Sequence, residues 1–137
     1  LYEYIDKAQE GNMTLFLIDL DHFKSINDIY GHQEGDRALV LTADTLRANI
    51  KIQDGLIVRA GGDEFVVLMF GTRTPEEVEQ MRQTIKAKLD TEYAKDEHLQ
   101  KISASVGSSY SQTGKENFDV LVGEADAMMY REKEKNR

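Results

Sequence analysis

The 137-residue sequence contains no cysteine and no apolar run of membrane-spanning length. The lack of cysteine excludes a disulfide scaffold, a zinc–thiolate site and a cysteine nucleophile, and it is typical of a reducing compartment. The longest apolar run, Phe65 to Phe70, is far too short to cross a bilayer, and no signal-peptide pattern opens the chain. We therefore expect a cytoplasmic domain without direct membrane contact, although a longer parent protein could be membrane-anchored.

Basic residues are in the minority, because 17 Lys and Arg stand against 25 Asp and Glu, for a net charge of -8. No basic stretch is long enough to follow a nucleic-acid backbone, so we do not expect nucleic acid as a partner. An acidic domain can still bind a nucleotide if metal ions screen the phosphates. We expect residues 1–137 to form one compact domain, a fragment of a larger signalling protein that is truncated at both ends.

The hydrophobic pattern predicts helices alternating with short strands. Helices are expected at residues 1–10, 21–28 and 37–50, from residue 74 and from residue 118, and strands at 13–18, 56–59, 65–70 and 102–106. Gly31 and Gly35 are expected to interrupt the chain between the second and third helices. Thr74 and Glu77 form a predicted capping box, and Gly61 and Gly62 a predicted two-residue hairpin turn with positive φ. The hairpin requires antiparallel pairing and the outer strands require helical crossovers, so we predict an α+β fold of the βαββαβ type, with a mostly antiparallel central sheet flanked by helices.

Acidic residues follow the predicted strand ends. Asp19 and Asp21 lie where the first strand ends, and Asp63 and Glu64 lie just after the two glycines. Carboxylates that converge at one rim repel each other unless a cation binds between them, and oxygen ligands favour Mg²⁺ or Mn²⁺ over zinc. Alternatively, Asp21 is the N-cap of the next helix, and Asp63 and Glu64 cap a strand in solvent. The spacing alone leaves both interpretations open.

Longer motifs distinguish the two interpretations. Residues 61–65 read GGDEF, and residues 19–36 read DLDHFKSINDIYGHQEGD, which matches D-x-D-x-F-K-x-I-N-D-x-x-G-H-x-x-G-D at every fixed position. Residues 105–107 match an S-x-G strand end, and residues 125–133 resemble A-D-x-A-[LM]-Y-x-x-K. These motifs occur in order over almost the whole chain. The sequence therefore resembles the GGDEF family of diguanylate cyclases, which have a palm-like nucleotidyl cyclase domain.

The resemblance implies two Mg²⁺ or Mn²⁺ ions in each active site. It assigns Asp19, the backbone carbonyl of Leu20 and Asp63 as metal ligands, with Glu64 assisting. Asp63 or Glu64 would receive the proton of the attacking 3′-hydroxyl group, and the sequence does not decide which. Lys24 corresponds to a lysine that neutralises phosphate charge; without the resemblance, it would be a surface lysine of a helix.

The resemblance also implies a guanine site. Asn27 and Asp36 correspond to the residues that recognise the base. One carboxylate can accept both hydrogen-bond donors on the edge of guanine, whereas adenine lacks that donor pair. Asp36 could also be the N-cap of its helix, and both roles could hold together. Gly61 and Gly62, which have no Cβ, would let a phosphate or a base lie against the backbone.

Lys133 and Arg137 lie four residues apart and correspond to residues that hold the β- and γ-phosphates. The alternative is a solvated run of charge at the end of the chain. The family pattern here is K-x-x-G-R-N, and this chain has Asn136 in place of the glycine, while Glu132 replaces a usual alanine. The family's opening D-x-L-T-G-L-x-N-R and its final strand are missing.

A further departure precedes the hairpin. Many members of the family carry an R-x-x-D product-inhibition site, and the nearest match here is Lys51-Ile52-Gln53-Asp54. Lysine cannot reproduce the forked contact of a guanidinium group. We therefore expect product inhibition at this site to be weak or absent.

The function implied is the condensation of two GTP molecules into cyclic di-GMP and two pyrophosphates. Each 3′-hydroxyl group would attack the α-phosphate of the other GTP, so catalysis needs a homodimer, and a covalently linked sensor domain outside this chain could control that encounter. The main alternative is a catalytically silent module that binds GTP or cyclic di-GMP. A more distant one is a related palm-fold enzyme with another product. The intact set of metal-binding and catalytic residues favours catalysis.

Overall fold

The computed structural model describes residues 12–50, 55–71, 73–111 and 117–136. The helix expected at residues 1–10, the sequence Lys51-Ile52-Gln53-Asp54 and Arg137 lie outside the described residues. The elements follow one another along the chain as β1 (Met13–Asp21), α2 (Phe23–Tyr30), α3 (His32–Asn49), β2 (Gly55–Arg59), β3 (Glu64–Phe70), α4 (Pro75–Ala94), β4 (Ser103–Tyr110) and α5 (Phe118–Lys135). No helix of the described part of the chain has the length and apolar character that crossing a bilayer requires.

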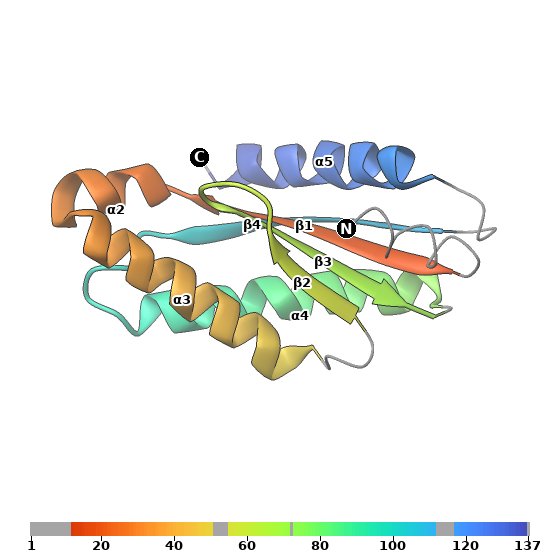
Figure 1. The fold of residues 1–137 in the computed structure, drawn as a ribbon, viewed down its shortest axis with the longest axis horizontal. Helices are drawn as coiled ribbons and strands as arrows, with labels where there is room; N and C mark the ends of the chain where they lie inside the picture. The colour runs from red at the N-terminus through yellow and green to blue at the C-terminus, as the bar shows by residue number, and fades with distance from the viewer. Residues whose placement is uncertain (1–11, 51–54, 72, 112–116, 137) are drawn as a thin grey trace.

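The strands form one sheet in the order β2-β3-β1-β4, and every neighbouring pair is antiparallel. Figure 1 shows α5 on one face of this sheet and α3 and α4 on the other. The α+β fold predicted from the sequence is therefore confirmed. All nine residues of β1 are buried, which fits a central strand covered by helices on both faces.

Two apolar clusters hold the layers together. Phe16, Ile18 and Leu20 of β1 pack in the larger cluster with residues of α3 and α4. Leu15 and Leu17 pack in the smaller cluster, with Leu121 and other residues of α5. Successive side chains of a strand point to opposite faces of the sheet. The even-numbered residues from Phe16 to Leu20 therefore face α3 and α4, and the odd-numbered Leu15 and Leu17 face α5.

The boundary between α2 and α3 differs from the prediction. Helix α3 begins at His32 rather than near Arg37, and only Gly31, with φ of 92°, separates it from α2. Gly35 lies inside α3, and a Cβ there would fall 1.8 Å from Oδ1 of Asn27. Glycine is therefore used at this position for a close helix contact and not as an interruption.

Both N-cap interpretations are wrong. The N-cap of α2 is His22, with φ of 68°, because Asp21 still belongs to β1. The N-cap of α3 is Gly31, which leaves Asp36 exposed within the helix. These two carboxylates are thus available for other partners.

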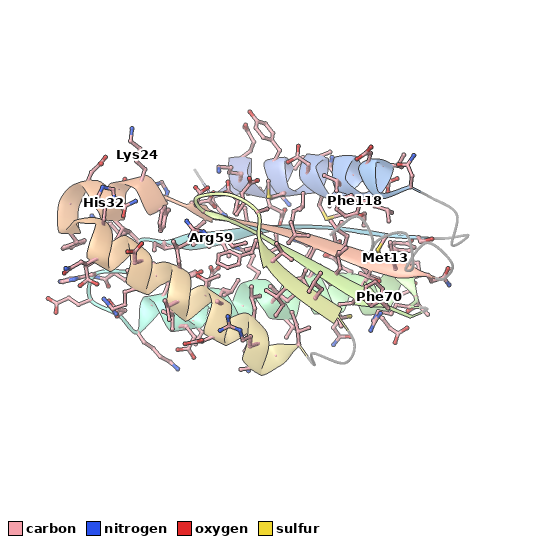
Figure 2. The ribbon with its side chains drawn as sticks, in the orientation of Figure 1. Met13, Lys24, His32, Arg59, Phe70 and Phe118 are labelled. Atoms are coloured by element: carbon pink, nitrogen blue, oxygen red, sulfur yellow. The ribbon has the colours of Figure 1, made fainter. Side chains whose placement is uncertain are left out.

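The turn between β2 and β3 also differs from the prediction. It comprises residues 60–63 and is closed by a hydrogen bond of 2.9 Å from the Ala60 N–H to the Glu64 carbonyl. Neither Gly61 nor Gly62 has a positive φ, because a turn of this length does not need one. The Arg59 guanidinium donates to the carbonyls of Gly61 and Gly62 at 3.0 and 2.9 Å (Figure 2), and so holds the turn from within.

Helix α4 starts with the predicted capping box, in which Thr74 and Glu77 exchange hydrogen bonds of 2.8 and 3.1 Å. One face of α4 then binds the outer edge of β4. Asp90 accepts from the Ala104 N–H at 2.9 Å, and Lys86 donates to the Ala104 carbonyl at 2.6 Å. Arg82 donates to the Val106 carbonyl at 3.1 Å. These side chains satisfy backbone groups that a sheet edge leaves unpaired.

The turn after α4 is tied to α3. The Arg37 guanidinium makes two hydrogen bonds to the Asp96 carboxylate, one of them 2.9 Å long. Asp96 also accepts from the backbone N–H groups of His98 and Leu99. The Arg37 guanidinium and these N–H groups stabilise the charged form and hold the pKa of Asp96 below its ordinary range.

Replacing Gly107 with alanine should destabilise the fold. A Cβ at residue 107 would lie 1.9 Å from the Ala125 carbonyl oxygen and 2.6 Å from the Met129 nitrogen, so α5 would have to move. We expect the free energy of unfolding to fall by about 2–3 kcal/mol in urea denaturation. The matched control is Gly123→Ala in α5, where a Cβ meets nothing within 4 Å. Its free energy of unfolding should rise by up to about 1 kcal/mol, because alanine favours the helix more than glycine does. Equal urea-denaturation midpoints for the two variants would contradict the close packing of α5 on Gly107.

Asp96→Asn should lower stability in a pH-dependent way. Because the folded-state pKa is lowered, the ionised carboxylate stabilises the fold above the unfolded-state pKa of about 4, and this contribution disappears as pH falls toward the folded-state pKa. We expect a loss of about 1 kcal/mol at pH 7 that shrinks steadily toward pH 2. Urea denaturation across this range measures it, with the exposed Asp44→Asn as the control. A loss that is independent of pH would contradict the ion pair.

Candidate active site

The alternation of β1 directs two carboxylates toward α5. Leu15 and Leu17 pack with α5, and Asp19 and Asp21 continue the same face of the strand. Asp19 is 6% exposed and Asp21 is 5% exposed. Burying a charge is costly unless it is paired and hydrogen-bonded, so the end of β1 requires partners from neighbouring elements.

The turn between β2 and β3 is fastened to the end of β1. The Leu20 N–H donates to the Asp63 carbonyl at 3.1 Å, and Asp19 lies opposite Glu64 in the strand register. In an antiparallel strand the N–H and C=O of one residue point to the same side, so the Leu20 carbonyl is also directed toward this turn. The structure thus brings together Asp19, Leu20, Asp63 and Glu64, which come from two separate segments.

The acidic groups at this turn are held close enough to affect one another. Burial raises the pKa of Asp63, and the negative charge of Asp19 raises it further. Burial likewise raises the pKa of Glu64, followed by the charges of Asp19 and Asp63. Both side chains therefore retain protons more readily than an ordinary carboxyl group, even though the positive charge of Lys133 lowers both pKa values.

Lys133 of α5 supplies a positive charge. Its ammonium group donates to Asp19 and lies 3.6 Å from Oδ1 of Asp21. Burial lowers the pKa of Lys133, but the hydrogen bond and charge of Asp19 outweigh that effect and leave it raised. Lys133 is therefore cationic and faces the acidic cluster.

Asp21 is bound into a second set of contacts that the sequence did not reveal. Its Oδ2 atom accepts from the Ser105 hydroxyl at 2.5 Å and from the Asn136 amide at 2.7 Å, and the same amide lies 3.1 Å from the Ser105 oxygen. The only sequence signal for this role was that Asn136 replaces a glycine of the family pattern. Asp21 thus joins β1, β4 and α5, whereas Asp19 faces the turn.

The donor set fits a hard divalent cation. Oδ1 of Asp19 is buried and has no hydrogen-bond partner, so one carboxylate oxygen is left to coordinate a cation. No group of three or more His, Cys, Asp or Glu side chains in the described part of the chain has the geometry to hold a metal ion by itself. Mg²⁺ usually takes only one or two carboxylates and completes its shell with water and substrate phosphates. Asp19, Asp63 and the Leu20 carbonyl are the groups that would contribute to such a site.

A cavity of about 160 Å³ opens beside this cluster. Its lining residues are Asp21, His22, Lys133 and Asn136. His22 adopts the left-handed conformation here, an uncommon backbone state for a residue other than glycine. The cavity gives small polar groups access to the Lys133 ammonium group.

The residues predicted to bind the base lie in the second half of α2 and in the first turns of α3. Asn27 is half-buried and its side chain lies against Gly35 of α3, and Asp36 is the next residue along α3. Asn27 is four residues past the first residue of α2, so about 6 Å of helix separates it from the end of α2 that adjoins the acidic cluster. The structure thus brings Asn27 next to the segment that carries Asp36, at a distance from Asp19.

Three other predicted residues, in α2 and in the turn before β3, lie at or near the surface. Lys24 is exposed on the first turn of α2, and Figure 2 shows its side chain extending away from the body of the molecule, so the structure does not bring it to the carboxylates. A Cβ added at Gly62 would have nothing within 4 Å, and a Cβ added at Gly61 would lie 3.3 Å from Oε2 of Glu64. The surface of the turn at Gly62 is therefore open to a ligand.

The whole chain, residues 1–137, matches the family described as diguanylate cyclase, GGDEF domain. It is 37% identical over 129 residues to the bifunctional diguanylate cyclase/cyclic di-GMP phosphodiesterase MucR of Pseudomonas aeruginosa, covering 93% of this chain and 18% of that protein. It is 34% identical over 145 aligned residues to the probable diguanylate cyclase DgcF of Escherichia coli, covering 100% of this chain and 45% of that protein. The chain thus spans less than half the length of either relative.

Solved structures agree with these matches. The coiled coil and GGDEF domain of DgcB from Caulobacter crescentus, crystallised in complex with c-di-GMP, matches with a TM-score of 0.84 and 26% identity, over 99% of this chain and 76% of that chain. Diguanylate cyclase SiaD from Pseudomonas aeruginosa matches with a TM-score of 0.82 and 28% identity, over 97% of this chain and 53% of that chain. The four-stranded antiparallel sheet, the turn fastened to its central strand and the family match over every residue lead to one conclusion: the chain belongs to the diguanylate cyclase GGDEF-domain family.

Proposed function

We propose that this chain condenses two GTP molecules into cyclic di-GMP and two pyrophosphates. In each of the two steps, the 3′-oxygen of one GTP forms a bond to the α-phosphorus of the other. The bond from that phosphorus to pyrophosphate breaks, and the hydroxyl proton leaves. The observation that carries the proposal is the buried Asp19, with one unpartnered oxygen, facing Asp63 and Lys133. The names of the relatives MucR and DgcF support the same activity.

Asp19, Asp63 and the Leu20 carbonyl would hold Mg²⁺ or Mn²⁺, two ions in each active site. Bound there, the ions would activate the 3′-hydroxyl group and stabilise charge on the reacting phosphate. Asp63 and Glu64, whose pKa values are raised, are the candidates to accept the hydroxyl proton. Lys133 now pairs with Asp19, and in the GTP complex it would bind phosphate oxygens together with Arg137.

The position of α2 supports a guanine site where Asn27 of α2 lies against α3. A GTP molecule that lies along α2 would have its phosphates at the acidic cluster and its base at the corner of α2 and α3. Asn27 and Asp36 would then bind the polar edge of guanine, and the exposed Lys24 would neutralise phosphate charge from the solvent side. Gly61 and Gly62 would allow the backbone of the turn to approach the nucleotide.

Catalysis on this plan needs two chains. One chain binds one GTP, so the acceptor α-phosphate must come from a second chain whose turn faces the first. The domain would belong to a longer signalling protein, in which a linked sensor domain controls how often two copies meet. The greater length of the relatives is consistent with further domains.

The direct test is product formation by the dimerised chain with GTP and Mg²⁺. We expect cyclic di-GMP and pyrophosphate to be separated by chromatography, and we expect Asp63→Asn to lower the turnover at least about 100-fold, because it removes a metal ligand and a candidate base. The fold should persist, because the hydrogen bond to Leu20 uses the backbone of residue 63. The exposed Asp44→Asn is the control and should retain full activity. Binding of GTP without product would instead identify a silent regulatory module.

Gly35→Ala tests whether Asn27 takes part in the proposed guanine site. The added methyl group would collide with the amide of Asn27, a side chain that can rotate away at little cost to stability. We expect the KM for GTP to rise roughly tenfold, because one hydrogen bond to the base is lost, while urea denaturation shows only a small change. The exposed Val40→Ala on the same helix is the control. An unchanged KM in Gly35→Ala would show that Asn27 does not bind substrate.

A further inference from the structure

The last turn of α5 is fixed from one side by an ion pair that crosses the edge of the sheet. Arg82 of α4 donates to Glu132 of α5 at 3.0 Å, to the Val106 carbonyl of β4 at 3.1 Å and to Glu79 on its own helix. The side chains of Arg82 and Glu132 are only 11% and 15% exposed. Figure 1 shows α4 and α5 on opposite faces of the sheet, so this contact joins both helix layers around β4.

The same turn is fixed from the other side by Asn136. Its amide donates to Asp21 at 2.7 Å and lies 3.1 Å from the Ser105 hydroxyl oxygen, which connects the C-cap of α5 to β1 and β4. The Asn136 N–H lies 3.3 and 3.2 Å from the carbonyls of Glu132 and Lys133, which closes the helix end. Asn136 is therefore held by both its side chain and its backbone.

Lys133 lies between these two anchors. It follows Glu132 directly and precedes Asn136 by three residues, and its ammonium group reaches Asp19. The surface of β4 beneath α5 is made of small residues, namely Gly107, Ser108 and Ser109. Small residues offer few interlocking side chains that would prevent the helix end from shifting. The last buried apolar residue of α5 is Met129, so beyond it the lateral position of Lys133 depends on its own contact with Asp19 and on polar contacts at residues 132 and 136.

We propose that Glu132 and Asn136 are positioning residues that form a two-point latch on the last turn of α5 and hold the Lys133 ammonium group at the phosphate site. Both are positions at which this chain departs from the family pattern, where alanine and glycine are usual. The inference rests on the proposed function, because it assigns Lys133 to phosphate binding. The latch sets where the cation lies before GTP arrives, so that binding requires less reordering of α5.

Two variants of one residue separate position from charge. Glu132→Ala removes the charge and the contacts with Arg82 and Lys135, whereas Glu132→Gln removes the charge but keeps oxygen and amide groups, of which the oxygen can accept from Arg82. We expect Glu132→Ala to raise the KM for GTP roughly five- to tenfold at nearly unchanged kcat, because Lys133 binds ground state and transition state alike. The KM of Glu132→Gln should stay within about twofold of the wild-type KM, because the glutamine oxygen keeps the hydrogen bond from Arg82. Asn136→Ala should raise the KM for GTP by a similar factor to Glu132→Ala.

The control is Glu134→Ala, which removes the same side chain from an exposed position of the same turn and should leave KM unchanged. A second readout needs no activity: amide hydrogen exchange of residues 131–136 in the nucleotide-free chain should be faster in Glu132→Ala and Asn136→Ala than in Glu134→Ala. Faster exchange with an unchanged KM would overturn the positioning role, and so would equal effects of Glu132→Gln and Glu132→Ala. If the chain made no product while exchange changed as expected, the latch would stand and the proposed function would fail.

Discussion

Two buried carboxylates at the end of a buried strand are the constraint on which the site depends. Asp19 and Asp21 continue a face of β1 that is otherwise apolar, so each needs a partner that offsets the loss of water. The Oδ2 atom of Asp21 is satisfied by hydroxyl and amide groups from β4 and α5, whereas its buried Oδ1 has no hydrogen-bond partner and lies 3.6 Å from the Lys133 ammonium group. Asp19 is likewise half satisfied, by Lys133, and its buried Oδ1, on the side of the turn, has no hydrogen-bond partner. A site that needs positive charge in this way is suited to binding a cation.

The fold places each partner without long loops at the site. The antiparallel pairing of β1 with β3 returns the turn to the end of β1, where the Leu20 N–H fixes it. Gly107 allows α5 to approach β4 closely enough for residues of its last turn to reach Asp19 and Asp21. Helix α4 closes the outer edge of β4 and, through Arg82, also reaches α5. The same contacts that complete the sheet therefore position the charged groups.

The sequence predicted the type and order of the described elements, because strand β1 and helices α4 and α5 have strong hydrophobic patterns. It failed where a local preference competed with a tertiary contact. Glycine at position 35 reads as a helix interruption, yet it serves a contact with Asn27 inside α3. The glycines of the hairpin read as a tight turn, yet a longer turn is held by Arg59. The partners of Asp21 could not be predicted, because Ser105 and Asn136 are distant in sequence and carry no signal of their own beyond one departure from a family motif.

The central claim is that Asp19 and Asp63 bind a divalent cation next to Lys133. The most direct measurement is the paramagnetic broadening of backbone amide signals by substoichiometric Mn²⁺ in the isotope-labelled chain with GTP. The account predicts that amides of residues 19–21 and 62–64 broaden first, and that Asp19→Asn removes this selectivity while the rest of the spectrum is retained. Broadening that is centred elsewhere, or that is unchanged in Asp19→Asn, would contradict it.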